Sequence, residues 1–297
     1  MKLRDLLLLA LVCFTWAVHT IVSKIVVSGM EIPPLFYAAL RYGLVAILAL
    51  PWLLPLPRPL WRTALVGLLM GAGGFALFFT GIKTATPSGS AVVQQLGLPM
   101  MTLLSVVMLG EIPDRRRWFG SALTFSGAIL VMWDPAGLSL TGGLVFVAAS
   151  AFVGSLASVM MKQVHGVRPL QFQAWVGLTS VLVLTPLTAA LEDGQIVRAA
   201  AAGWPFVAAV LFSAVVVSLL THTIYYGLLL RYPANLLAPL MVLNPLMTVA
   251  LGIAVTHDPF DLRMGIGTAL ALLGVLIVST GGNPIARLRA WARARAD

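Results

Sequence analysis

Aromatic, hydroxyl and imidazole side chains share one face of the first apolar segment of the chain. The face is formed by residues spaced i, i+3, i+4 and i+7, namely Trp16, His19, Thr20 and Ser23. This spacing places side chains on one side of a helix. An indole supplies stacking, and the hydroxyl and imidazole groups supply hydrogen bonds, so the face suits the wall of a cavity for a small solute. The alternative is a polar seam that joins helices, and we favour the cavity.

A second polar stripe lies late in the chain and contains Ser218, His222, Tyr225 and, beside it, Tyr226. His222 could exchange a proton near neutral pH, because imidazole titrates there. A buried histidine more often stays neutral and forms hydrogen bonds, so proton coupling through His19 or His222 is the less favoured interpretation. Phe75 and Phe79 are further candidates for solute contact, with a lipid-facing position as their commoner alternative.

Arg41 is the only arginine expected inside an apolar segment. A guanidinium can hold a carboxylate through two parallel hydrogen bonds. Arg41 also lies about two helical turns from the nearer end of its segment, where a long side chain can extend its charge toward water. We therefore favour a structural or gating role for Arg41 over direct solute binding.

Two prolines interrupt apolar segments, and each has side-chain amides nearby. Gln94 and Gln95 precede Pro99. Asn244 stands directly before Pro245. A proline leaves a carbonyl one turn back without its hydrogen bond and bends its helix. The amides could satisfy that carbonyl or contact a solute, and we predict a shared hinge, with Gln95 and Asn244 as candidate ligands.

No catalytic constellation is apparent in the sequence. An intramembrane hydrolase needs a serine beside a histidine and oxyanion donors, and only Ser90 and His222 offer these groups. Prenyl transfer needs clustered aspartates for Mg²⁺, and the apolar segments contain no Asp pair. The phosphate-binding motif GxxxxGK[ST] is absent. We therefore predict no catalytic residues, no metal and no cofactor.

Membrane-spanning helices must position all of these candidates. Charged residues make up 10% of the 297 residues and hydrophobic residues 60%, whereas a soluble domain carries about a quarter charged residues. A helix needs about 20 mainly apolar residues to cross a bilayer. Ten apolar runs approach that length: 5–28, 34–55, 61–82, 88–109, 117–133, 141–161, 169–190, 204–230, 234–256 and 264–280. The sequence therefore predicts an all-α integral membrane protein with ten transmembrane helices.

The net charge of +9 is unevenly distributed between alternate ends of these helices. With the amino terminus inside the cell, fourteen Lys and Arg residues fall on the cytoplasmic side and four on the other side. The basic cluster Arg115–Arg117, between the fourth and fifth runs, belongs to the larger group. This bias predicts that both termini are cytoplasmic. The basic excess therefore indicates topology and lipid contact, and no nucleic-acid partner is expected.

The chain contains an internal repeat. A shift of 146 positions superimposes three prolines of one half on three of the other: Pro87, Pro99 and Pro113 on Pro233, Pro245 and Pro259. Two halves of five helices follow, and the odd number inverts the second half relative to the membrane. The predicted division is 1–137, 138–282 and a basic cytoplasmic tail, 283–297. Secondary transporters contain such inverted repeats, with the binding site between them.

Several motifs occur together in a characteristic order. They are Trp16 with Lys24, Pro34 with Arg41, Gly110-Glu111, the basic turn Arg115–Arg117, and Gly120 with Gly127. In this order they resemble the EamA-type branch of the drug/metabolite transporter superfamily. Ala17 stands where that family usually has glycine, and Thr256-His257 replaces a second Gly-Glu pair. Lys24 and Glu111 are accordingly predicted to be gating or structural residues.

The resemblance implies a secondary transporter, in particular an exporter of small metabolites such as amino acids, that works by alternating access. It would lie in the cell inner (plasma) membrane as a multi-pass protein. The candidate side chains suit a small polar or zwitterionic solute with some apolar body. The expected partners are a small-molecule substrate and membrane lipids, with a monomer as the working unit. A membrane sensor or scaffold without transport is the alternative, and an intramembrane hydrolase is disfavoured.

Overall fold

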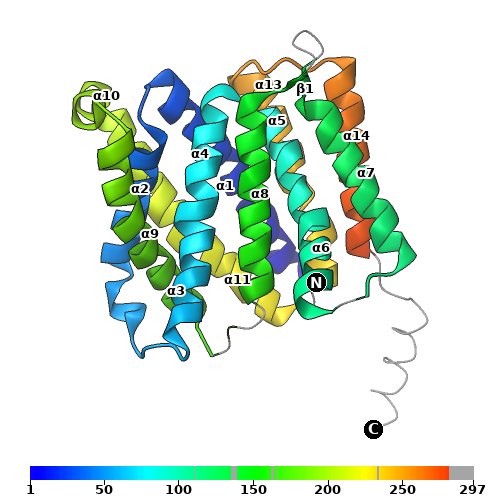
Figure 1. Ribbon diagram of the computed structural model, residues 1–297, viewed down its shortest axis with the longest axis horizontal. Helices are drawn as coiled ribbons and strands as arrows, with labels where there is room; N and C mark the ends of the chain where they lie inside the picture. The colour runs from blue at the N-terminus through cyan, green and yellow to red at the C-terminus, as the bar shows by residue number, and fades with distance from the viewer. Residues whose placement is uncertain (111, 135–138, 162–163, 165, 233, 281–297) are drawn as a thin grey trace.

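The computed structural model describes the chain except for residues 111, 135–138, 162–163, 165, 233 and 281–297. Helices account for nearly all of the described residues (Figure 1). The strands among these residues are β1, Trp133–Asp134, and β2, Ser139–Leu140, which pair antiparallel. The all-α class predicted from composition is therefore confirmed, with one short hairpin in addition. The predictions for Glu111 and for the tail 283–297 lie outside the described residues.

The hairpin separates two series of helices. Before it come α1 (Leu3–Lys24), α2 (Pro34–Leu48), α3 (Leu60–Leu68), α4 (Gly74–Thr84), α5 (Pro87–Val93), α6 (Gly97–Leu109) and α7 (Arg115–Met132). After it come α8 (Gly142–Met161), α9 (Pro169–Leu191), α10 (Gln195–Leu211), α11 (His222–Arg231), α12 (Ala234–Leu240), α13 (Leu243–Val255) and α14 (Leu262–Thr280). Wide π turns η1 (Ile25–Gly29), η3 (Leu69–Gly73) and η5 (Phe212–Thr221), and 3₁₀ turns η2 (Leu50–Leu53) and η4 (Gln94–Leu96), extend or join them.

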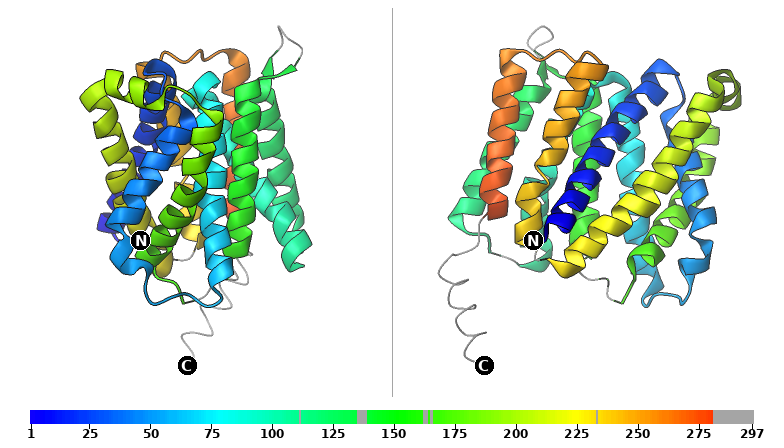
Figure 2. Two further views of the ribbon diagram at one scale, coloured as in Figure 1. Left: turned by 60° about the vertical axis from the view of Figure 1, so that its left-hand side comes forward. Right: turned by 180° about the vertical axis from the view of Figure 1, so that it is seen from behind.

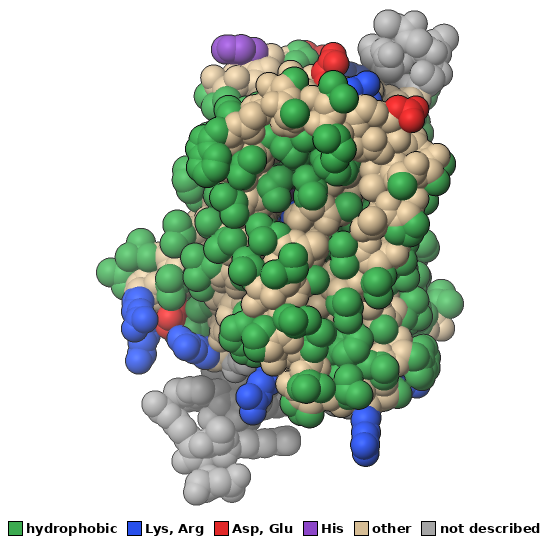
Figure 3. All heavy atoms as spheres, turned by 90° about the vertical axis from the view of Figure 1, so that its left-hand side faces the viewer, with side chains coloured by type: hydrophobic (Ala, Val, Ile, Leu, Met, Phe, Trp, Pro, Cys, Tyr) green, Lys and Arg blue, Asp and Glu red, His purple; other side chains and the backbone are tan. Residues whose placement is uncertain are grey.

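Within the part of the chain that the structure describes, seven continuous helical segments are long and apolar enough to cross a membrane. They are Leu3–Gly29, Leu60–Thr84, Pro87–Leu109, Gly142–Met161, Pro169–Leu191, Gln195–Leu228 and Leu262–Thr280. Two shorter apolar helices, α2 and α13, stand beside them. Hydrophobic side chains cover the side of the bundle in Figure 3, as lipid contact requires. The protein is therefore a multi-pass membrane protein.

Local signals define where several helices begin. Pro34, Pro87 and Pro169 each occupy the first turn of a helix, where the missing N–H of proline costs no hydrogen bond. The carboxylate of Glu192 accepts hydrogen bonds from the backbone N–H groups of Leu35 and Phe36, at 2.8 and 2.9 Å. Glu192, which follows the end of α9, thus accepts hydrogen bonds from free N–H groups in the first turn of α2 and links the two helices.

Two helices are interrupted at corresponding places. The 3₁₀ turn η4 separates α5 from α6, and a turn at residues 241–242 separates α12 from α13. Pro99 and Pro245 follow these breaks within the first turn of the next helix. The breaks lie 146 positions apart in the sequence, the same shift that superimposes the prolines. The bends predicted from the two prolines therefore appear as interruptions just before them.

Close helix pairs hold the bundle together. The principal pairs are α7 with α14, α2 with α9, α4 with α8, and α1 with α13. Glycines line the α7–α14 contact: an added Cβ at Gly127 would lie 2.5 Å from the backbone nitrogen of Ala271 and from the backbone oxygen of Gly267. Small residues permit this approach of backbones inside a membrane. The packing role that the spaced glycines suggest is consistent with this contact.

The two ends of the bundle differ in charge. Figure 1 and the rear view in Figure 2 place the start of α1 and the end of α14 at the same end. On the face shown in Figure 3, Lys and Arg side chains gather at that end. The end of α6, the start of α7 with Arg115–Arg117, and the start of α9, next to Arg168, also lie at that end.

Replacement of Gly127 by alanine is expected to destabilise the fold by ~1–3 kcal/mol, the usual cost of overpacking a tight contact. The new methyl group would meet backbone atoms of α14, which cannot move aside as a side chain can. Thermal unfolding of the purified protein in detergent measures the change. Gly227→Ala is the matched control, because nothing lies within 4 Å of a Cβ at Gly227. Equal melting temperatures for the two variants would contradict this account of the α7–α14 contact.

Candidate functional site

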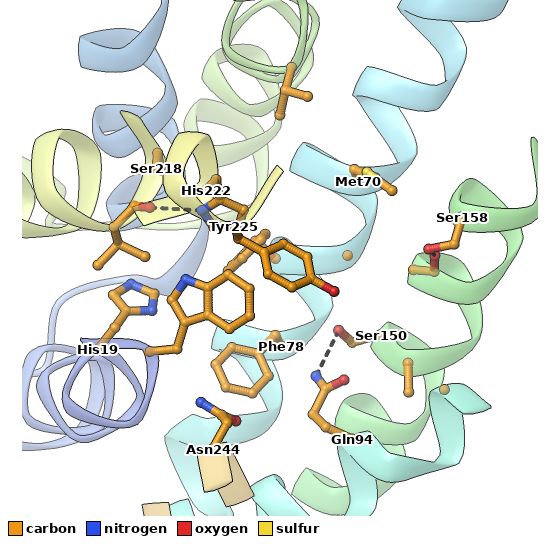
Figure 4. A pocket seen from close by; sticks show the side chains of 18 of the residues that line it. His19, Met70, Phe78, Gln94, Ser150, Ser158, Ser218, His222, Tyr225 and Asn244 are labelled. Carbon is orange, nitrogen blue, oxygen red and sulfur yellow. Dashed lines mark hydrogen bonds between the residues drawn. The ribbon is translucent and has the colours of Figure 1, made fainter. Parts of the chain in front are cut away.

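A cavity of about 660 Å³ lies between helices from both sides of the hairpin. Before the hairpin, α1, α2, η3, α4, α5, η4 and α6 contribute to its wall; after it, α8, α9, η5, α11 and α13 do so. Figure 4 shows side chains from these elements pointing toward the same space. The lining runs from Ser150 in the middle of α8 to Met161 at its end and to Phe172 in the first turn of α9. The cavity thus extends from mid-depth toward the basic end of the bundle.

Most of the site residues predicted from the sequence contribute to this wall. Those that line the cavity are Trp16, His19, Thr20, Arg41, Phe75, His222, Tyr225 and Asn244. They come from five different elements, so the tertiary fold gathers positions that are up to 228 residues apart in the sequence. Their contact with a solute stays a prediction.

Trp16 forms an aromatic cluster with α11. Its ring centroid lies 5.0 Å from that of His222 and 5.3 Å from that of Tyr225, in an edge-on arrangement. The indole Nε1 of Trp16 is buried and has no hydrogen-bond partner among the described residues. His222 Nδ1 lies 2.7 Å from the carbonyl oxygen of Val217 and donates to it, since a carbonyl only accepts. The cluster presents a rigid apolar surface to the cavity.

Arg41 lies at the centre of a hydrogen-bond network across α1, α2 and η5. Its Nε donates to Ser218 Oγ at 3.0 Å, and its Nη1 lies 3.2 Å from His19 Nε2. His19 Nε2 also lies 2.9 Å from Ser213 Oγ. The guanidinium carbon is 4.1 Å from the centroid of Phe75, a cation–π distance. The network fixes the guanidinium in the wall of the cavity.

The two amides at the cavity wall are partly engaged. Gln94 Nε2 donates to Ser150 Oγ at 3.3 Å and links η4 to α8, as the dashed line in Figure 4 marks. Asn244 Nδ2 donates to the carbonyl of Cys13 at 3.1 Å and links α13 to α1. These bonds connect the broken helices to their neighbours, and the hinge and the solute contact of the amides stay predictions.

Two predicted residues lie outside the lining. Phe79 is fully buried and stacks on Tyr37, with ring centroids 4.8 Å apart, so it belongs to the core. Its neighbour Phe78 faces the cavity instead. Gln95 donates its amide back to the carbonyl of Ala91, 3.1 Å away, while Gln94 takes the cavity position. The cavity therefore takes the neighbouring position in each case, Gln94 and Phe78.

The residues predicted to be gating or structural have separate positions. Lys24 Nζ donates to the carbonyls of Ile82, Lys83 and Ala85 at 3.1, 3.1 and 2.9 Å. It therefore satisfies carbonyls at the end of α4, a structural contact. Pro99 and Pro245 lie after the helix breaks, outside the cavity lining. Any gating role of these residues stays a prediction.

Several lining residues were missed by the sequence analysis. Among them are Tyr42, Phe78, Ser150, Ser155, Ser158 and Gln173. The serines of α8 offered a usable signal, because hydroxyl groups on an otherwise apolar helix tend to face the protein interior. Ser155, for example, donates to the carbonyl of Gly97 across the α6–α8 contact at 2.8 Å.

The end of the bundle opposite the basic end is closed by packing and hydrogen bonds. An added Cβ at Gly81 would lie 2.6 Å from the carbonyl oxygen of Gly143, so α4 and α8 meet without side chains between them. Asp258 Oδ2 accepts from the backbone N–H of Ser88 at 2.8 Å and holds the start of α5. Together with Lys24, these contacts hold the helices together at the end of the bundle away from the cavity lining.

A profile of the EamA-like transporter family matches residues 3–133 and again residues 140–280. The two matches cover most of the chain, which therefore belongs to the EamA-like transporter family. The family resemblance stated from the motifs is confirmed. One solved crystal structure superposes with a TM-score of 0.62 at 18% identity, covering 92% of this chain and 94% of the other, and it supports the fold alone.

Curated relatives are similar over nearly the full length. The "Probable amino-acid metabolite efflux pump" of Salmonella typhimurium is 27% identical over 290 residues, 93% of this chain and 95% of the relative. The Escherichia coli (strain K12) protein of the same description is 26% identical and covers 95% and 94%. The "Uncharacterized inner membrane transporter YedA" of E. coli K12 is 33% identical over 105 residues, 33% of this chain and 34% of the relative.

Thiol labelling can check the helical phase at the η4 break. Cys13 is the only cysteine of the chain, so Cys13→Ala provides a cysteine-free background. In that background we expect Gln94→Cys to react with a small water-soluble maleimide faster than Gln95→Cys, because only Gln94 lines the cavity. Mass spectrometry of the intact protein measures the rates. Gln95→Cys is the matched control, because it differs from Gln94→Cys by one position in the same turn. A faster reaction at Gln95→Cys would contradict the assigned lining.

Proposed function

We propose that this protein is a secondary exporter of small amino-acid-like metabolites across the cell inner membrane, working by alternating access. The observation that carries the proposal is the cavity itself. It lies at mid-depth, receives side chains from both series of helices, and extends toward one end of the bundle. A site with this placement lets one series move against the other and expose the solute to either side.

The helix pairs support two inverted halves, 1–137 and 138–282, followed by the tail 283–297. If α8 corresponds to α1 and α13 to α6, the contact of α1 with α13 repeats as the contact of α8 with α6. If η5 and α11 correspond to α4, the contact of α4 with α8 repeats as the contact of η5 and α11 with α1. When the two halves are exchanged, α7 corresponds to α14 and α2 to α9, so each of these two contacts corresponds to itself. This pattern is expected of a two-fold axis in the membrane plane.

The count of ten crossings rests on the seven long apolar segments together with α2, α7 and α13. The basic side chains at the end where α1 begins support cytoplasmic termini. The cavity then extends toward the cytoplasm, so the described conformation corresponds to an inward-facing state. Such a state is suited to collect a solute from the cytoplasm for export.

Two observations support this substrate class: the descriptions of the relatives and the side chains of the cavity wall. Two relatives similar over nearly their full length are described as probable amino-acid metabolite efflux pumps, and the wall combines aromatic, hydroxyl and amide groups. A sensor or scaffold without transport remains the alternative, and measured exchange separates it from a transporter. The hydrolase alternative is weakened because Ser90 Oγ is buried without a hydrogen-bond partner among the described residues, so no described histidine activates it.

Counterflow in proteoliposomes tests the transport proposal. A mixed pool of amino acids and related metabolites is screened by mass spectrometry for solutes that exchange. Trp16→Ala is expected to slow exchange about tenfold, the effect of losing ~1.4 kcal/mol of apolar contact. Trp204→Ala is the matched control, since Trp204 is 72% exposed. If no solute in the pool moves in folded wild-type protein, the sensor alternative replaces the transporter.

Cysteine accessibility in intact cells tests the proposed orientation. In the Cys13→Ala background, Arg115→Cys is expected to resist a membrane-impermeant maleimide in intact cells and to react after lysis. His257→Cys, exposed at the opposite end of the bundle, is expected to react in intact cells. The reverse pattern would place the termini outside the cell.

A further inference from the structure

Arg41 contributes a full positive charge to the cavity wall. An arginine stays charged even when it is buried. Its side chain is only 1% exposed, and its guanidinium carbon lies 4.1 Å from the ring centroid of Phe75 and 5.3 Å from that of Tyr42. The side chain therefore does not reach bulk water, which removes one of the reasons for favouring a structural or gating role from the sequence.

The protein partners of Arg41 are neutral. Nε donates to the hydroxyl of Ser218, and Nη1 donates to Nε2 of His19. Because a guanidinium can only donate, Nε2 must accept, and His19 carries no charge in this arrangement. No Asp or Glu forms an ion pair with Arg41 in the part of the chain that the structure describes. The charge of Arg41 is thus left without a counter-ion.

The remaining nitrogen of Arg41 is available to a ligand. Nη2 donates no hydrogen bond to any described residue. Arg41 is one of the residues that line the cavity, and only 1% of its surface is exposed. With Ser218 and His19 fixing the other two nitrogens, Nη2 is the part of the guanidinium that can donate into the cavity.

The rest of the wall provides no other charge. Among the described lining residues there is no Asp, Glu or Lys. Charged groups at this depth in a membrane are costly unless they are paired, and an unpaired buried charge is stabilised strongly by an opposite charge. A solute with a carboxylate would supply that charge, whereas a cation without one would be repelled.

We propose that the exported solute carries a carboxylate and that Arg41 binds it through Nη2, with the apolar body of the solute against Trp16 and Tyr225. This inference rests on the proposed transport function and narrows its substrate to amino acids or other small monocarboxylates. Ser218 and His19 act as positioning residues that hold the guanidinium in place.

The test compares solutes that share one apolar body. Leucine carries a carboxylate and an ammonium group, 4-methylpentanoate carries only the carboxylate, and leucinamide carries only the ammonium group. Counterflow of each is measured with wild-type protein in proteoliposomes. We expect leucine, 4-methylpentanoate or both to exchange at least about tenfold faster than leucinamide. Exchange of leucine alone identifies a site for zwitterions. Exchange of 4-methylpentanoate identifies a site for plain anions. Exchange of leucinamide at the same rate as the two acids overturns the proposal.

Variants test the role of Arg41 directly. Arg41→Gln removes the charge and keeps hydrogen-bonding groups, and it is expected to lower exchange of the carboxylates at least about tenfold. Arg41→Lys keeps the charge and should retain part of the activity. Arg115→Gln, an exposed position outside the cavity, is the matched control and should exchange normally. Unchanged exchange in folded Arg41→Gln overturns the proposal, and if that variant does not fold, the leucinamide comparison decides.

A binding measurement separates failure of this inference from failure of the transport proposal. If none of the three probes exchanges, the thermal stability of the detergent-purified wild type is measured with each probe at millimolar concentration. Stabilisation by the carboxylates but not by leucinamide retains the carboxylate site in a protein that does not transport these solutes. Equal stabilisation by all three, or by none, overturns the carboxylate site.

Discussion

The hydrocarbon core of a membrane offers no hydrogen bonds, so each polar group placed there must find its partner inside the protein or in a water-filled cavity. Much of the architecture can be understood as the answer to this constraint. Glu192 satisfies the start of α2, Lys24 satisfies the end of α4, and Asp258 satisfies the start of α5. The serines and threonines of the helices mostly donate to carbonyls one turn back, as Thr248 does to Asn244. Arg41 is the most demanding case, because its partners in the described residues accept hydrogen bonds from Nε and Nη1 only and do not cancel its charge.

The same constraint separates rigid regions from the cavity. Glycines bring backbones together in the α7–α14 and α4–α8 contacts, which leave no room even for a methyl group. Where the polar and aromatic residues converge, the helices are interrupted by η4 and by the turn at 241–242 and contain wide π turns. Irregular backbone at membrane depth is tolerated only where it is buried or lines a cavity. The cavity and the helix breaks therefore belong to one structural solution.

Much of the fold was predictable because helices follow from local composition. Long apolar runs predict spans without reference to any other part of the chain. The matching prolines at 99 and 245 predicted that two distant helices would share a feature, and both helices are interrupted just before these positions. The cavity wall was less predictable. Trp16, His19 and Thr20 share a face that depends only on helical period, whereas Gln94 and Phe78 line the cavity in place of the expected Gln95 and Phe79. Which of two adjacent side chains faces the cavity depends on how its helix packs against its neighbours, which no local pattern encodes.

The sequence by itself determined the class of protein, the helical elements and the family, because hydrophobicity, charge asymmetry and motif order are properties of the chain alone. It also identified which polar groups are unusual in an apolar segment. Only the tertiary structure decided which of these groups meet, since contacts between α1, α2 and η5 depend on how the helices pack. The surroundings of Arg41 illustrate the difference. Its charge is evident from the sequence, but the absence of a counter-ion among the described residues and the unpaired Nη2 depend on how it packs against neighbours 22 and 177 positions away.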